Sequence, residues 1–299
     1  MTRTRPPQGE ALVAWALAAA AALVVLVTYS RLEPADLYHV SRDGFTGGLS
    51  RALVLVDFPI ALVAIALVLV AVPALPRATW PVAAAAIALS AVVAWPGVVD
   101  EDDLDARWIN AVPALGVLLA LGLTAAATRR AGAGFAQRRP LDTARAVAAV
   151  LVVLASLPWL SAELGFHFPG DVFMGEEPAR QQDGTLLAAV HLGHHHGTDG
   201  ALLVLTALLL SRVVLPAGAL RAASTAYLGA MLAYGTVNLV QDLWLEQVVK
   251  RGWTAHEIPS ALEPGPRPIW LVILAVAALT TVALLREQEG VAQRSYSVP

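Results

Sequence analysis

Apolar residues recur along this chain in eight long stretches, separated by short polar segments. We place them at residues 11–29, 52–75, 79–99, 109–128, 144–162, 199–217, 222–242 and 268–285. Each stretch is long and apolar enough to cross about 30 Å of hydrocarbon as a helix. The pattern therefore predicts an all-α fold, a polytopic membrane helix bundle of about eight transmembrane helices.

The composition supports the same interpretation. Of the 299 residues, 57% are hydrophobic and 14% are charged, whereas soluble domains carry about 25% charged residues. Cysteine is absent, which excludes disulfides, zinc–thiolate sites, iron–sulfur clusters and thiol catalysis. The first apolar stretch follows a short arginine-containing segment, as in a signal peptide. It shows no clear cleavage site, so we expect a retained signal-anchor.

The distribution of arginine predicts the orientation in the membrane. If the amino terminus lies inside, the inner segments hold more than half of the basic residues, including the run TRRAGAGFAQRRPLDTAR at 128–145. Cytoplasmic loops of membrane proteins carry such an excess. We therefore expect a multi-pass protein of the bacterial inner membrane with both termini cytoplasmic. All seven histidines then lie outside or at the outer ends of helices.

The order of the segments indicates an internal repeat. In each half a helix ends in an acidic, histidine-containing loop, two helices follow, and a polar loop precedes the fourth helix. We divide the chain into a four-helix unit at 1–130, a basic cytoplasmic linker at 131–143, a second four-helix unit at 144–286 and a tail at 287–299. Parallel repeats of this kind occur in membrane transporters.

The second unit carries nitrogen and oxygen ligands at one end of three successive helices. The segment HLGHHHGTDG at 191–200 holds four histidines and one aspartate. We interpret the chain from Asp183-Gly184 onward as helical, which aligns the ligands of this segment four residues apart on one face. The two flanking helices end in polar residues at the same spacing. The candidate ligands are His191, His195, His194, His196, Asp199, Glu163, His167, Asp242 and Asn238.

This ligand set predicts a transition-metal site. Metal sites in helical bundles are built from inward-facing histidine and carboxylate side chains. Without cysteine, the set suits zinc, iron or Cu(II) better than Cu(I), and we slightly favour zinc. Two alternatives stay open: a metal-free proton network, since histidine titrates near physiological pH, and a solvated polar loop.

Several other polar groups have two interpretations each. His256 is either a ligand on a lid over the site or part of an ordinary loop. Asp57 either belongs to the site or pairs with Arg51 or Arg107. The acidic segment DEDDLD at 100–105 is either a solvated surface or a funnel that attracts cations. Most tryptophans, Trp159 among them, stand near helix ends and are interpreted as interfacial anchors.

A family resemblance enters through the same half of the chain. Its features are the acidic, histidine-bearing end of the helix near 163–167, the Asp199-Gly200 opening, the stretch GAMLAYGTVNLVQD at 229–242, the loop histidine His256 and the opening RPIW at 267–270. With these features, residues 144–286 resemble a family of small four-helix bacterial membrane proteins of unknown function. That family tends to accompany cytochrome-oxidase assembly factors, so the resemblance implies metal handling. Glu246 departs from it, because a histidine is expected there.

Three functions are consistent with these observations. The first is metal delivery or respiratory-complex assembly. The second is a metal-dependent hydrolase or oxygenase acting on a lipid or lipid-soluble substrate. The third, a proton-coupled transporter, is least favoured, because the helices near 201–211 and 271–285 are almost free of polar groups. We expect membrane lipid and subunits of a membrane complex as partners, and no nucleic acid.

Overall fold

The protein is helical almost throughout. The computed structural model describes residues 6–31, 40–99, 105–164, 173, 178–180, 186–188, 196–262 and 266–296. The α-helices are α1 (Gly9–Arg31), α2 (Gly44–Leu55), α3 (Ala61–Ala71), α4 (Trp80–Ala91), α5 (Ala111–Ala131), α6 (Asp142–Ala155), α7 (Leu157–Leu164), α8 (His196–Leu210), α9 (Ala219–Trp244) and α10 (Ile269–Tyr296). Shorter elements are the π-helical turns η2 (Val56–Ile60) and η7 (Leu245–Val249), the 3-10 turns η3 (Val72–Ala74), η4 (Arg77–Thr79), η5 (Val92–Ala94) and η6 (Trp108–Asn110), and the strands β1 (Pro178–Arg180) and β2 (Leu186–Ala188).

Five helical segments in the described part of the chain are long and apolar enough to cross a membrane. They are Gly9–Arg31, Gly44–Ala74, Arg77–Ala94, Trp108–Ala131 and Ile269–Val291. These five coincide with the first four expected stretches and the last. The other three stretches are also helical, but each is interrupted, shorter or less apolar than a single span.

The expected helix at 144–162 is divided into α6 and α7 at Ser156. Pro158 follows two residues later and lacks a backbone N–H, so it cannot continue the ladder of α6. In the first turn of α7 the same proline is tolerated. The Val152 carbonyl accepts both the Ser156 hydroxyl at 2.8 Å and the Ser156 backbone N–H at 3.0 Å, at the end of α6.

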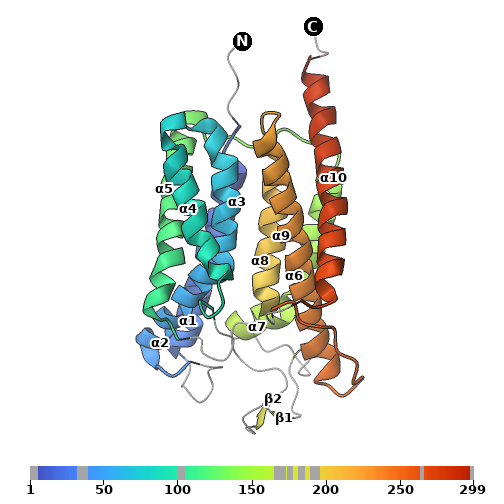
Figure 1. Ribbon diagram of the computed structural model, residues 1–299. Coiled ribbons are helices and arrows are strands. Elements are labelled where there is room, and N and C mark those ends of the chain that lie inside the picture. The colour runs from blue at the N-terminus through green and yellow to red at the C-terminus, as the bar shows by residue number, and fades with distance from the viewer. Residues whose placement is uncertain are drawn as a thin grey trace.

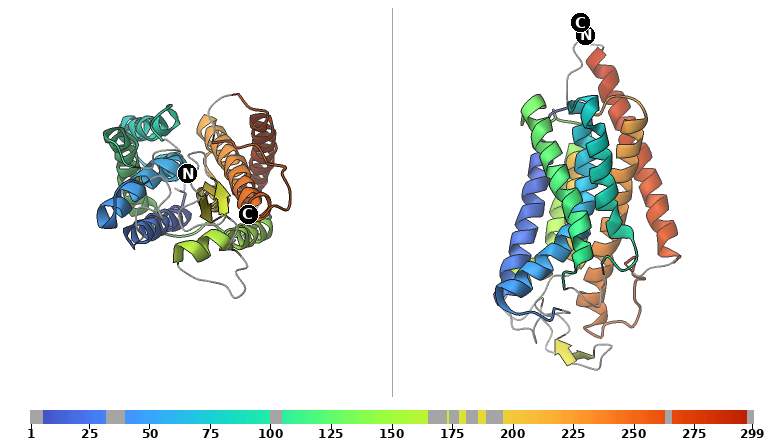
Figure 2. Two further views of the ribbon diagram at one scale, coloured as in Figure 1. Left: turned by 90° about the horizontal axis from the view of Figure 1, so that it is seen from below. Right: turned by 60° about the vertical axis from the view of Figure 1, so that its left-hand side comes forward.

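The helices form an elongated bundle with both chain termini at one end (Figure 1). We call this the proximal end, where α1 begins and α10 finishes. The distal end is the opposite one, where α1 and α9 finish and α8 begins (Figure 1, Figure 2). The short hairpin of β1 and β2 also lies at the distal end.

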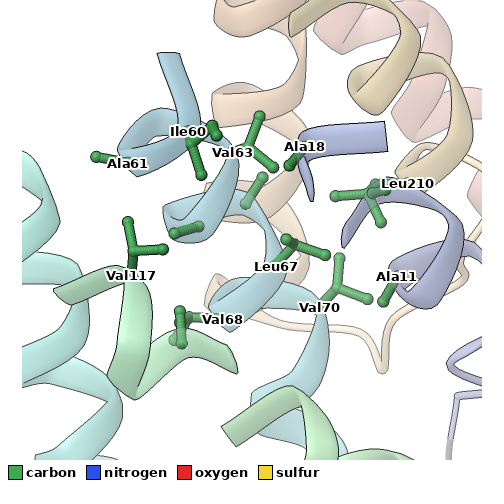
Figure 3. Close-up of a cluster of buried hydrophobic side chains, with 14 of the residues drawn as sticks. Ala11, Ala18, Ile60, Ala61, Val63, Leu67, Val68, Val70, Val117 and Leu210 are labelled. Carbon is green, nitrogen blue, oxygen red and sulfur yellow. The ribbon is translucent and has the colours of Figure 1, made fainter. Parts of the chain in front are cut away.

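Helix α3 is the centre of the bundle. Its 11 residues are apolar on every side, and a helix without a polar face is stable only when it is surrounded by others. The span that contains α3 is 72% buried, whereas the other four spans are 22–39% buried. Figure 3 shows Leu67 and Val70 of α3 beside Ala11 of α1 and Leu210 of α8. One apolar core therefore joins the two halves of the chain.

The expected linker at 131–143 is bound to the start of α1. The backbone N–H groups of Gln8 and Gly9 donate to the carbonyls of Gly132 and Gly134 at 3.2 and 2.8 Å. The N–H of Ala136 donates to the buried carboxylate of Glu10 at 2.9 Å. The segment is thus part of the packed proximal end.

One predicted element is wrong. The helix expected from Asp183-Gly184 through the histidines does not form over residues 186–188, which pair as β2 with β1 in antiparallel register. A short apolar run fits a strand and a buried helix equally well, and an Asp-Gly pair favours a hairpin as well as a helix start. Among the described residues, helix α8 runs from His196 to Leu210.

Candidate functional site at the start of helix α8

The first residue of α8 contacts the polar side chains of α9. His196 Nε2 lies 2.6 Å from Gln241 Oε1 and 3.3 Å from Asp242 Oδ1. Both partners are hydrogen-bond acceptors at these atoms, so Nε2 carries the proton and donates it. In the neutral imidazole, Nδ1 then holds a free lone pair.

Asp242 also fixes the helix itself. Its Oδ2 accepts the backbone N–H of Gly197 at 3.0 Å, and the first N–H groups of a helix have no partner within it. A carboxylate at this position interacts favourably with the positive end of the helix dipole. Asp242 is 1% exposed, so it holds the start of α8 and the His196 ring from within the packed bundle.

Three glycines permit the close approach of α8 to α9. A Cβ on Gly200 would lie 2.5 Å from the Gly235 carbonyl oxygen, and one on Gly235 would lie 2.8 Å from the Gly200 oxygen. A Cβ on Gly197 would lie 2.6 Å from both Asp242 Oδ2 and the Trp159 ring. Small residues at a helix contact allow two backbones to pack directly in this way.

A polar face of α9 continues beside this contact. Asn238, Asp242 and Glu246 follow one another every four residues and are 1%, 1% and 3% exposed. Asn238 Nδ2 has no hydrogen-bond partner among the described residues. Glu246 accepts from Lys250 Nζ at 2.6 Å. Asp199 is also buried, and it stands one turn into α8 from His196.

An apolar cluster supports the site from the side of α6 and α7. Trp159 is 1% exposed and packs in one cluster with Val152, Val204 and Leu239. Its interpretation as an interfacial anchor is therefore wrong. Trp80, Trp95, Trp108 and Trp253 are exposed, as interfacial residues would be.

The structure brings together some of the expected ligands. His196 and Asp242 meet, and Asn238 and Asp199 lie buried on the same two helices. His191, His194, His195 and His167 lie outside the described residues, and Glu163 is described only by its place in α7. Among the side chains that the structure does describe, no group of three or more histidines and carboxylates could hold a metal ion.

The loop residue His256 contacts the bundle through its backbone. Its carbonyl accepts from the Trp244 indole N–H at 2.7 Å, and its N–H donates to Thr254 Oγ1 at 3.1 Å. The ring is exposed. These contacts fit the interpretation of an ordinary loop better than that of a ligand over the site.

The acidic segment before α5 is described only at its last residue. Asp105 Oδ2 accepts the backbone N–H of Ser41 at 3.1 Å, and Asp105 Oδ1 accepts the Ser50 hydroxyl at 3.2 Å. Residues 100–104 lie outside the described part of the chain. The last residue of the acidic segment therefore contacts α2 and the residues before it. This contact is not what a fully solvated segment would show at Asp105.

The sequence pattern indicated neither Gln241 nor the partner that Asp57 has in the structure. Gln241 follows Asn238 by three residues, so the helical spacing could have placed both on one face. Asp57 accepts from Asn110 Nδ2 at 2.5 Å. Its expected arginine partners are engaged elsewhere, because Arg51 lies over the Tyr29 ring and Arg107 donates to the Gly97 carbonyl.

Known proteins add nothing to this geometry. No protein-family model, no curated protein and no solved structure matches the chain.

Proposed function

We propose that this chain is a bacterial inner-membrane protein that holds a transition-metal ion at its distal end and serves in metal handling, such as the assembly of a respiratory complex. The proposal has two parts, an eight-helix topology and a metal site. The observation that carries it is the His196–Asp242 pair at the start of α8.

The positions of the termini support an even number of crossings. Both termini lie at the proximal end (Figure 1), whereas five crossings would put them on opposite sides of the membrane. The remaining candidates are α6 with α7, α8, and α9. Helix α9 has 26 residues, or about 39 Å at 1.5 Å per residue. Helix α8 is shorter, but it packs against α1, α3, α6 and α9, so lipid thickness does not set its length.

The charges support a cytoplasmic proximal end. Arg129, Arg130, Arg138 and Arg139 lie at or near the segment that joins α5 to α6, which runs at the proximal end (Figure 1). An excess of arginine in a short loop favours the cytoplasmic side. On this topology His196 faces outward.

The orientation of the His196 ring supports a role as a ligand. Histidines that bind a metal through one nitrogen usually donate the other ring N–H to a carboxylate or carbonyl. Here Nε2 donates to Gln241 and Asp242, which leaves Nδ1 for a metal ion. Asp242 then orients the ligand, which refines the expectation that it binds the metal itself. The further ligands would come from the histidines that precede His196 in sequence, with zinc the favoured metal.

Metal analysis of purified protein tests the site. After zinc loading and chelator-free washing, we expect about one zinc ion per wild-type chain and a loss of most of it in His196→Ala. Asp242→Asn should retain zinc with affinity about 10- to 100-fold lower, because it removes only the orienting carboxylate. His256→Ala is the matched control, since its ring is exposed and it should bind zinc normally.

Two results would overturn the proposal: a wild-type chain that stays free of zinc, iron and copper after loading, or a His196→Ala variant that binds as the wild type does.

Because the chain has no cysteine, its topology can be tested with single cysteines. A thiol reagent that cannot cross membranes should label Ala255→Cys in intact cells and Ala133→Cys only after the inner membrane is opened. The reverse labelling pattern would contradict the orientation.

A further inference from the structure

A second buried acidic group lies in the first unit, away from the His196 site. The span Gly44–Ala74 is interrupted at η2, where Phe58 has non-helical dihedral angles of φ −137° and ψ 121°. Pro59 removes one backbone N–H from the ladder at the same place. Asp57 lies in this interruption and is 0% exposed.

One oxygen of Asp57 is held by a neutral donor. Oδ2 accepts from Asn110 Nδ2 at 2.5 Å, and the same nitrogen donates to the Val98 carbonyl at 3.0 Å. Asn110 Oδ1 accepts the backbone N–H of Arg107 at 2.6 Å. The Asn110 amide is therefore fixed on both sides, and it offers the carboxyl group a donor without a charge.

The other oxygen of Asp57 has no partner in the part of the chain that the structure describes. Oδ1 is buried without a hydrogen bond among the described residues, and the structure gives Asp57 no ion pair there. The helices packed against η2 are α2, α3, α5 and α8. Their charged or titratable groups near the distal end are Arg51, which lies over Tyr29, and on α8 His196 and Asp199; Arg107 precedes α5, and α3 has none.

A carboxylate in this position lacks what an ionised group needs. Taking an unpaired charge out of water is expensive, and a buried acid in such surroundings becomes neutral instead. A neutral acid keeps the Asn110 bond on Oδ2 and carries its proton on Oδ1. We propose that Asp57 is a proton-binding site in the interior of the first unit, occupied at neutral pH and emptied when the proton passes to water and leaves the carboxylate.

Glu10 is the internal control for this inference. It is also 0% exposed, but it accepts from the guanidinium of Arg212 at 3.2 Å and from the N–H of Ala136 at 2.9 Å. A carboxylate beside a fixed positive charge stays ionised. Each acid also has one buried oxygen without a hydrogen bond among the described residues, so the two differ in the charge of their donors and not in their burial.

Carbodiimide labelling distinguishes the two protonation states. Dicyclohexylcarbodiimide is apolar and reacts with protonated carboxyl groups. In the full-length protein in liposomes at pH 7, peptide mass analysis should find the label on Asp57 and not on Glu10, with the yield falling as the pH rises. Equal labelling of both residues, or protection of Asp57 by sodium ions at constant pH, would overturn the proposal in favour of general reactivity or of a metal-cation site.

A stability measurement keeps the test decisive if the reagent cannot reach Asp57. A proton bound more tightly in the folded than in the unfolded state stabilises the protein at low pH, and that stabilisation is lost as the pH rises. The melting temperature of wild type minus that of Asp57→Asn should therefore fall between pH 5 and pH 9, because the amide is permanently neutral. A difference that stays constant or rises, together with unlabelled Asp57, would refute proton binding.

A third variant guards against a folding defect in Asp57→Asn. The Asn110 amide donates to Asp57 and so favours the ionised form. Asn110→Ala should shift the decline in Asp57 labelling to higher pH. A shift to lower pH would contradict the assigned geometry.

Discussion

The two ends of the bundle hold their buried and half-buried carboxylates in different ways. At the proximal end, Glu10, Asp142 and Glu287 all accept from arginine, with the Arg212–Glu10 contact at 3.2 Å and the Arg145–Glu287 contact at 2.5 Å. At the distal end, Asp57 and Asp242 accept from an amide, a backbone N–H and a histidine. The distal end also contains an ion pair, between Glu246 and Lys250.

This difference distinguishes carboxylates that stabilise the fold from carboxyl groups that can still interact with a cation. Arginine is always charged, so it keeps a neighbouring carboxylate ionised and leaves little attraction for another cation. An amide or a neutral histidine stabilises the carboxyl group without cancelling its charge. We infer that the proximal end fastens the two halves of the chain, while at the distal end Asp57 retains affinity for a proton and Asp242 orients the His196 ring.

The ion pairs of Glu10, Asp142 and Glu287 with arginine at the proximal end form what we call the proximal network. The largest loss of stability is expected from removing Arg145 from it. Arg145 is 7% exposed and donates to Ser211, Asp142 and Glu287. Removing one partner of a buried ion pair leaves the other charge uncompensated and costs about 3–5 kcal/mol. We expect Arg145→Ala to lower the melting temperature in detergent more than any variant at the distal end.

The double variant Arg145→Met with Glu287→Leu provides the control for this prediction. Replacing both partners by apolar residues of similar volume removes the stranded charge, and such replacements are often neutral or stabilising. The double variant should therefore recover much of the lost stability. A double variant less stable than Arg145→Ala would show that the pair supplies more than charge balance.

The next effect is steric and acts at the distal end. Gly200→Val places a side chain where a Cβ alone would lie 2.5 Å from the Gly235 carbonyl oxygen. Overpacking of this kind costs about 1–3 kcal/mol, and it separates α8 from α9. We expect a lower melting temperature together with the loss of the His196–Asp242 contact, detected as reduced zinc binding.

Gly122→Ala is the matched control in α5. A Cβ on Gly122 meets no atom within 4 Å, and alanine is the better helix former. The variant should be as stable as the wild type or slightly more so. If both glycine variants lost stability equally, the close contact of α8 with α9 would not be the cause.

The sequence predicts the helices of this protein well and its contacts less well. All eight apolar stretches contain helix, because the length and pattern of an apolar run are the strongest signal of secondary structure in a sequence. The division at Ser156 is visible afterwards in Pro158. The strand β2 escaped prediction, because LLAAV suits a strand and a helix alike. The proximal network escaped prediction because its members are far apart in sequence, and Glu10 and Arg212 are separated by 202 positions.

At the start of α8, spacing along the chain predicts a shared polar face but not its contacts. The spacing of four residues indicates that Asn238, Asp242 and Glu246 share one face, and the structure buries all three, two on α9 and Glu246 on η7. The spacing could not show that Asp242 would accept the Gly197 N–H, because that contact depends on glycines in two different helices. The partner of Asp57 was missed for the same reason, since Asn110 reaches it from another helix.

A smaller effect should follow from neutralising Asp242. Asp242→Asn keeps the shape of the side chain but removes the charge that interacts with the start of α8. Hydrogen bonds to a charged group contribute about 1.5–3 kcal/mol, and the amide retains part of that, so we expect a loss of about 1 kcal/mol in thermal unfolding. His196→Ala should cost less, because the ring is partly exposed. The reverse order would mean that His196, and not Asp242, holds the helix end.

The smallest effect is the loss of stability at low pH, where Asp142 of the proximal network becomes protonated. Burial alone would raise the pKa of Asp142, but hydrogen bonds from the Arg212 side chain and the Arg139 backbone N–H outweigh it and hold the pKa below its ordinary value of 3.8. A carboxylate with a lowered folded-state pKa stabilises the protein above the unfolded value, and this contribution is lost as the pH falls through the folded value. The stability advantage of wild type over Asp142→Asn should therefore be constant from pH 7 to about pH 5 and should decline below pH 3.8. Thermal melting of both proteins across this range measures it. An advantage that instead grows on acidification would show that Asp142 is held as a neutral acid, and the proximal end would then resemble the distal one.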